Sequence, residues 1–116
     1  LPSLQDSHVY DWFDALEVVE SYDFVHLVPG HGQVTNRAGV QRYREMGREV
    51  VGNVAERLDQ GHEAEQIIRE VRFADNIHVE TPRSAGYPDD LIESFQVRSI
   101  SRIIEDLLEQ PDLRNR

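Results

Sequence analysis

Cysteine is absent from this chain, which excludes disulfide bonds and thiolate zinc sites. The absence suits a reducing compartment, so we expect the cytoplasm as the location. Long apolar runs are also lacking, since none approaches the roughly 20 residues that a membrane-spanning helix requires. The first residues contain no basic segment followed by an apolar one. We therefore expect neither a signal peptide nor a membrane partner.

Positive charge is scarce as well. Twelve basic side chains stand against 22 acidic ones, which gives a formal net charge of −10. A field of this sign repels phosphate backbones, so we expect no nucleic-acid partner. The 116 residues amount to a single domain or a piece of one, and the missing initiator methionine favours a processed or truncated chain.

Helical spacing of apolar residues is the commonest pattern in the chain. It predicts four helices, at about 8–20, 36–60, 63–73 and 89–109. Asp6 or Ser7 is a suitable N-cap for the first helix, Asn36 for the second, and Gly61 suits the end of the second. Three glycines lie inside the second helix: Gly39, Gly47 and Gly52. Each weakens a helix, so their presence indicates either close packing against a neighbour or a break within this helix.

Residues 24–28 form the one convincing strand of the sequence. Phe24, Val25, Leu27 and Val28 leave almost no polar alternation, which predicts burial on both faces and pairing at both edges. Helices with one apolar stripe each would cover such a sheet. The sequence therefore predicts an α/β fold, helix-rich in content, that forms the closing part of a larger layered structure. Alone, it would expose strand edges and self-associate.

A glycine-bracketed turn, Pro29-Gly30-His31-Gly32, follows this strand directly. Glycine on both sides lets the backbone approach a ligand closely, and Pro29 fixes the entry to the turn. Functional side chains often lie on loops at the carboxyl ends of strands. We therefore predict that His31 is a metal ligand.

The segments Trp12-Phe13-Asp14-Ala15-Leu16 and 23–32, followed by a long helix, resemble the C-terminal part of the metallo-β-lactamase superfamily. The resemblance implies an αββα sandwich with two metal ions, usually zinc and in some relatives iron or manganese. It implies that His31 is the last ligand of that site. It makes residues 1–116 the C-terminal part of one domain, with a family-like core at 1–73. Residues 74–116, a loop and a C-terminal helix, match the family less well.

Most of the family's ligand set has no counterpart in this sequence. There is no His-x-His-x-Asp-His motif, the bridging aspartate would precede Leu1, and neither His8 nor Asp11 matches a ligand position. A catalytic metal needs about three protein ligands. We therefore expect this chain to be inactive alone and to need the missing N-terminal half of the fold or a self-associating copy. In the intact parent, metal-bound hydroxide would attack an ester, thioester, lactone, lactam or phosphoester of a small-molecule substrate.

Two other interpretations stay open. One is a non-catalytic helical module for interaction or dimerisation, and the other is a degenerate relative that keeps only the scaffold. The remaining polar residues carry weaker patterns. His26 is typical of a structural histidine, and His62 with Glu65 fits half a metal site or a solvated first helical turn. Ser84 and Ser94 lack the partners of a nucleophile.

Overall fold

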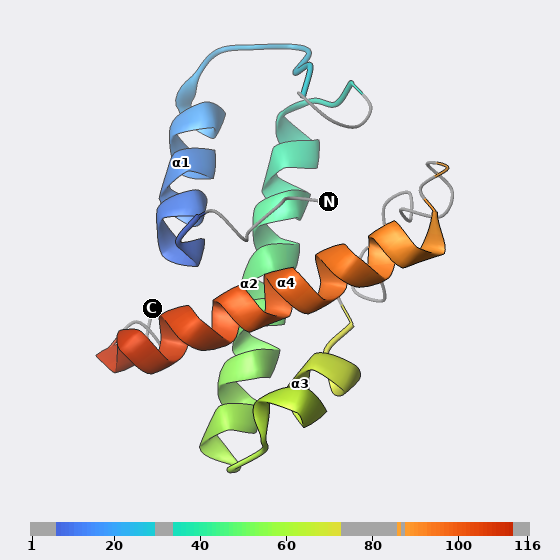
Figure 1. Cartoon of the computed structure of the whole chain (residues 1–116). Coiled ribbons are helices and arrows are strands. Elements are labelled where there is room, and N and C mark those ends of the chain that lie inside the picture. The colour runs from blue at the N-terminus through green and yellow to red at the C-terminus, as the bar shows by residue number, and fades with distance from the viewer. Residues whose placement is uncertain (1–6, 30–33, 73–85, 87, 113–116) are drawn as a thin grey trace.

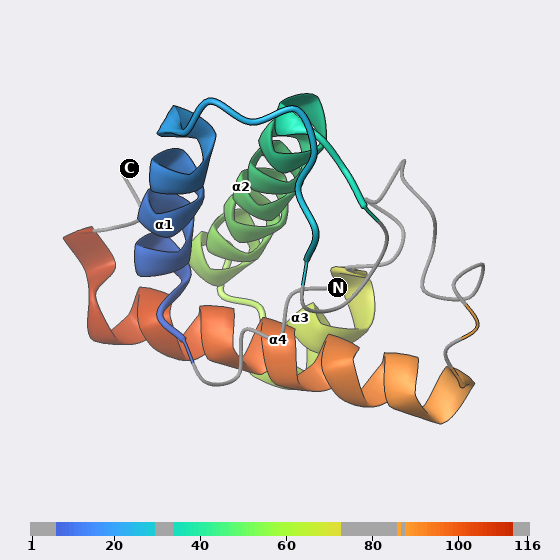
Figure 2. The same cartoon turned by 90° about the horizontal axis from the view of Figure 1, so that it is seen from above.

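The computed structural model describes residues 7–29, 34–72, 86 and 88–112. They form four helices: α1 (Val9–Ser21), α2 (Arg37–Asp59), α3 (Ala64–Glu70) and α4 (Asp89–Glu109). α4 crosses α2 near its middle, α1 lies beside the first half of α2, and α3 lies against the far end of α2 (Figure 1). Seen from above, α1 and α2 lie on the same side of α4 (Figure 2). The described residues therefore form a helical bundle of two layers.

The predicted α/β class is wrong for the part of the chain that the structure describes, which is all-α. Residues 24–28 form no strand, and their only extended pairing is one antiparallel bridge between Leu27 and Thr35. Val25 and Val28 are 76% and 78% exposed, where burial was expected. A strand forms only when a neighbour pairs along its length. Here the neighbouring segment turns into α2 at Arg37, so one bridge is all it offers. The described residues likewise show no portion of an αββα sandwich.

The predicted helices, by contrast, are confirmed, although α3 is shorter than expected. Asn36 caps α2 as predicted, because its side-chain oxygen accepts a hydrogen bond from the Gly39 amide at 3.0 Å. At the other end, Gly61 has a φ of +81°. The amides of Gly61 and His62 donate to the carbonyls of Leu58 and Arg57, both at 3.0 Å. This is a Schellman motif, in which glycine accepts the left-handed backbone that ends a helix.

The first helix is capped differently from the prediction. His8 occupies its N-cap position and makes no side-chain capping bond, so Ser7 is not the cap, and Asp6 lies outside the described residues. Instead, the amide of Val9 donates to a carboxylate oxygen of Asp106, on α4, at 2.9 Å. A residue distant in sequence thus satisfies an amide that a helix leaves unpaired.

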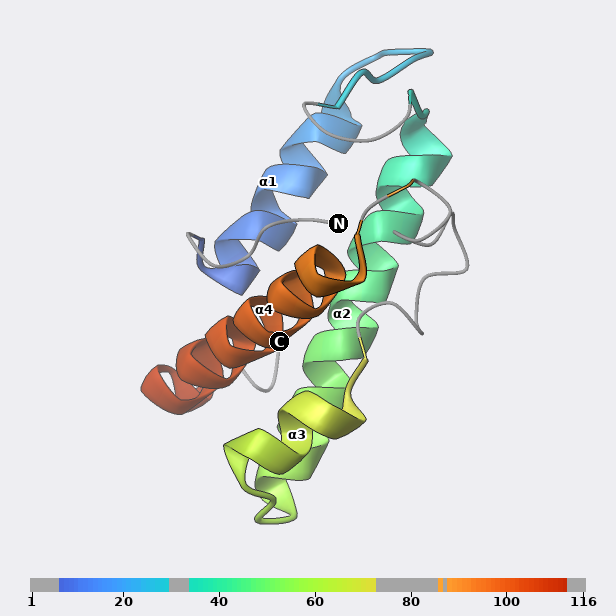
Figure 3. The same ribbon diagram turned by 45° about the vertical axis from the view of Figure 1, so that its right-hand side comes forward.

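The hydrophobic core lies where α4 crosses α2 (Figure 3). Its fully buried members come from all four described helices: Val9, Val50, Val54, Ile67, Ile100, Ile103 and Leu107. Val9, Tyr10 and Phe13 extend the core along α1. Each helix therefore buries the apolar stripe that its spacing predicts.

The glycines of α2 divide into two that are packed and one that is not. A Cβ atom on Gly47 would lie 2.7 Å from Phe13 Cε1 and 2.8 Å from Trp12 Cζ3, so α1 packs directly on that backbone. At Gly39 it would collide with the Thr35 hydroxyl. The prediction of close packing is therefore confirmed at these two positions. It is wrong at Gly52, where nothing lies within 4 Å.

None of the described helices combines the length and the apolar character needed to cross a bilayer. The assignment of the chain to one domain, with residues 1–73 as its family-like core, stays a prediction. Much of the segment that follows this core lies outside the described residues.

Candidate functional site

His31, the predicted metal ligand, lies outside the described residues, but both flanks of its loop are described. Leu27 and Thr35 exchange two backbone hydrogen bonds, from the Leu27 amide to the Thr35 carbonyl at 2.8 Å and in the reverse sense at 2.9 Å. This closely bonded pair joins the two ends of the segment 28–34. Leu27 and Thr35 therefore pair on either side of the residues that carry the Pro29-Gly30-His31-Gly32 pattern.

The flank on the α2 side is fixed to the helix that follows it. Thr35 packs its hydroxyl against the backbone at Gly39, which has no side chain to displace it. The Asn36 cap bonds to the same residue's amide. Thr35 and Asn36 are therefore both fixed to the first turn of α2.

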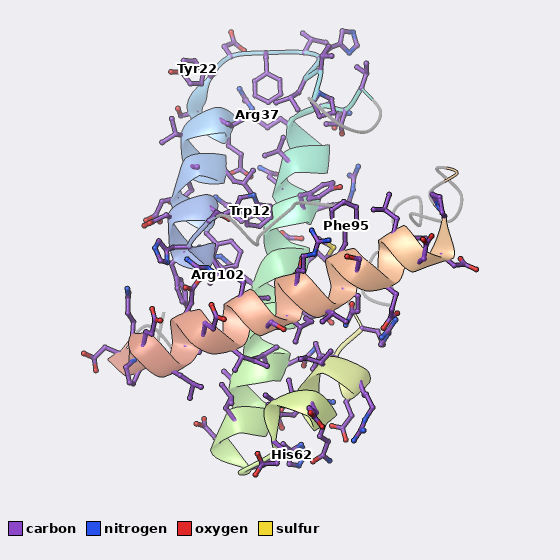
Figure 4. All side chains as sticks on the ribbon, in the orientation of Figure 1. Trp12, Tyr22, Arg37, His62, Phe95 and Arg102 are labelled. Atoms are coloured by element: carbon purple, nitrogen blue, oxygen red, sulfur yellow. The ribbon has the colours of Figure 1, made fainter. Side chains whose placement is uncertain are left out.

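The flank on the α1 side is fixed by Arg37. Its guanidinium Nη2 donates to the Tyr22 carbonyl and lies over the Phe24 ring, with 5.5 Å between Cζ and the ring centroid. Figure 4 shows Tyr22 and Arg37 at the same end of the molecule, where the chain passes from α1 to α2. No pattern in the sequence singled out Arg37. The only local signal was a cation at the first residue of a helix, where acidic residues are preferred.

The connection between α1 and α2, which the structure describes at residues 22–29 and 34–36, exposes several large apolar side chains. Its exposed large side chains are Tyr22, Val25, Val28 and Val34, and Val18 at the end of α1 is exposed as well. Isolated exposed valines need no explanation, but several in one short segment are typical of a contact surface. His26, in the same segment, is exposed rather than the buried structural histidine that we predicted.

A buried carboxylate forms a second polar centre, which the sequence analysis missed. Asp106 is 3% exposed and, besides capping α1, lies 3.0 Å from His8 Nδ1. Arg102 Nε lies 3.6 Å from the same carboxylate, and it donates to the Ser7 carbonyl at 3.0 Å. Arg102 is labelled in Figure 4, near the start of α1. These contacts tie the start of α1 to α4. They satisfy backbone groups, so the centre is structural.

His62 lies in a third cluster, and its neighbour there is Glu70 rather than the predicted Glu65. His62 Nδ1 lies 3.5 Å from a Glu70 oxygen, and Arg57 Nε donates to that oxygen at 3.0 Å. The Gln66 amide, and after it the Arg57 guanidinium, donate to the carboxylate and hold the pKa of Glu70 below its ordinary value. The carboxylate nearest to His62 in this cluster is therefore already paired with an arginine.

Metal-ligand geometry does not occur among the described residues. No group of three histidine, aspartate or glutamate side chains gathers in this part of the chain. Ser94 lies on α4, and Ser84 falls outside the described residues. What the structure describes of the candidate site is therefore its two flanks, which the Leu27–Thr35 pair joins.

No family model, curated protein or solved structure matches this chain. The likeness to metallo-β-lactamases rests on the quoted residues alone. It stays an interpretation of the sequence.

Proposed function

We propose that this chain supplies one metal ligand, His31, to a metal-dependent hydrolase. The observation that supports the proposal is the Leu27–Thr35 pairing, because it joins the two described flanks of the segment whose sequence contains His31. A ligand is effective when the backbone around it is held in place before the metal binds. Gly30 and Gly32 leave room for close approach to the ion.

The other ligands must come from outside the described residues, because a catalytic site takes about three protein ligands and no such group gathers there. In metal hydrolases the bound ion lowers the pKa of a water molecule and polarises the scissile bond. In this proposal the chain itself contributes the ligand, the closed loop and the helix behind it. Zinc is the expected ion, with iron or manganese as alternatives, and the substrate is a small ester, thioester, lactone, lactam or phosphoester.

The experiment is metal binding by the product of the complete gene. We expect His31→Asn to weaken zinc affinity by about 100-fold or more, because it removes a direct ligand, and to abolish hydrolysis of ester and thioester substrates. The matched control is His26→Asn, since His26 is exposed on the same connection. Equal zinc affinity in the His31 and His26 variants would refute the proposal. The 116-residue chain alone is expected to hydrolyse none of these substrates.

A second candidate function, a module for interaction or dimerisation, is favoured by the exposed valines of the connection. In that case Val25→Ser together with Val28→Ser would lower self-association without unfolding the bundle, because both side chains already contact solvent. Analytical ultracentrifugation across a range of protein concentrations tests this second candidate. A monomeric chain at every concentration removes dimerisation, and concentration-dependent mass that the serine variants abolish supports it.

A further inference from the structure

Arg37 occupies a place where helix electrostatics alone would not put a cation. It is the first residue of α2, and the unpaired amides at a helix N-terminus carry partial positive charge. Its guanidinium reaches instead to the opposite kind of helix end, the carbonyl of Tyr22, which is the C-cap of α1. Carbonyls at that end carry partial negative charge. The contact therefore offsets the unfavourable position of the cation.

A second contact makes this arrangement specific to arginine. The guanidinium lies over the Phe24 ring, 5.5 Å from its centroid, while it donates to Tyr22. A planar guanidinium can stack on an aromatic face and donate in its own plane at the same time, whereas a lysine ammonium is a point charge. Arg37 thus joins three parts of the chain: the end of α1 at Tyr22, Phe24 in the connection, and the start of α2.

We propose that Arg37 is a positioning residue that fixes the angle at which the connection leaves α1, and hence where the Leu27–Thr35 pair closes. Its effect on a metal ligand rests on the proposed function, whereas its effect on the connection does not. The three anchors of this connection are complementary. Arg37 fixes the α1 flank, Thr35 and Asn36 fix the α2 flank, and Leu27 bonds the flanks together.

The first test measures hydrogen exchange of the Leu27 and Thr35 amides in the 116-residue chain. Arg37→Met keeps the aliphatic stem and removes the guanidinium, and Arg42→Met is the matched control because Arg42 is exposed on the same helix. We expect about tenfold faster exchange at both amides in the Arg37 variant, the factor that corresponds to a lost charge-assisted hydrogen bond. Exchange in the α2–α4 core is expected to stay unchanged.

Phe24→Leu isolates the stacking contact in the same experiment. It removes the aromatic face and leaves the Tyr22 carbonyl in place, so we expect it to speed exchange at Leu27 and Thr35 by less than Arg37→Met does. Unchanged exchange at both amides in Arg37→Met would overturn the positioning role. So would an equal effect of Arg42→Met.

The second test uses cobalt(II) as a spectroscopic probe of the metal site in the complete gene product. We expect Arg37→Met to alter the visible absorption of bound cobalt, with rescue by Arg37→Lys only in part and no change in Arg42→Met. A spectrum that His31→Asn leaves unchanged would refute the proposed function and leave the exchange result standing. A spectrum that changes in His31→Asn but not in Arg37→Met would overturn the positioning of the ligand by Arg37.

Discussion

Valine behaves in opposite ways in two regions of this molecule. In the middle of α2, Val50, Val51 and Val54 are 0%, 5% and 0% exposed, whereas Val25 and Val28 in the connection are 76% and 78% exposed. The side chains are the same, so apolar character does not decide which of them is buried. In α2 the helix repeats the valines on one face, and α4 covers that face. In the connection no described element lies over them.

The comparison teaches that the two regions hold together by different means. The α2–α4 crossing is stabilised by burial of apolar surface, at about 25 cal/mol per Å² removed from water. The connection is held by hydrogen bonds and one cation–aromatic contact, at Leu27, Thr35 and Arg37. Such contacts each contribute less than the burial of a large side chain. The crossing should therefore determine the stability of the fold, while the connection determines only its own local geometry.

The largest expected effect comes from removing the same two methyl groups in each region. Val54→Ala should lower the free energy of unfolding by about 2 kcal/mol, because it removes buried surface and leaves a cavity. Val28→Ala should change it by less than about 0.5 kcal/mol, because that side chain is already in water. Urea denaturation followed by circular dichroism measures both. A comparable loss in the two variants would show that Val28 is buried in solution.

A smaller effect, with opposite signs, is expected at two glycines of α2. Gly47→Ala should destabilise the protein by about 1–2 kcal/mol, because the new Cβ would lie 2.7 Å from Phe13 Cε1. Gly52→Ala should stabilise it by about 0.5–1 kcal/mol, because alanine favours the helix and nothing lies within 4 Å. Thermal unfolding of both variants against the parent chain tests the pair. Stabilisation by both substitutions would mean that α1 does not pack on Gly47 in solution.

The smallest effect is expected from the exposed polar cluster at the far end of α2. Hydrogen bonds from Gln66 and Arg57 lower the pKa of Glu70 from its ordinary value of 4.5, so the folded state favours the charged carboxylate. The stabilisation of the folded state by the charged Glu70 carboxylate is present above pH 4.5. It is lost as the pH falls through the lowered pKa of Glu70. Glu70→Gln should therefore reduce the melting temperature slightly at pH 7 and converge with the parent chain in acid. Melting curves that stay parallel down to pH 3 would contradict the pKa shift.

The helices could be predicted from the sequence because their causes are local. Apolar spacing, the Asn36 cap and Gly61 each act within a few residues of the helix that they define. The strand could not be predicted safely, because a strand at 24–28 depends on a partner segment that periodicity does not reveal. The α/β class was wrong for the same reason. Non-local polar contacts were equally hidden, such as the Gln96 amide that donates to the Val71 carbonyl at 2.5 Å.

The candidate site was predictable only in part. The turn around His31 carries a sequence pattern, and its role as a ligand stays a prediction. The closed base of the loop has no such pattern, because the Leu27–Thr35 pairing joins residues on either side of the turn. Arg37 lies 15 residues from the carbonyl that it binds. Contacts of that range depend on how α1 and α2 pack, which only the structure reveals.

The carboxylate of Asp106 gives the order of synthesis a role in folding. α1 is made before α4, and the group that pairs the Val9 amide lies 97 residues further along the chain. Until α4 has left the ribosome, α1 has neither this cap nor the contact between Arg102 and Ser7. The first of the described helices to be translated is therefore among the last of them to be completed.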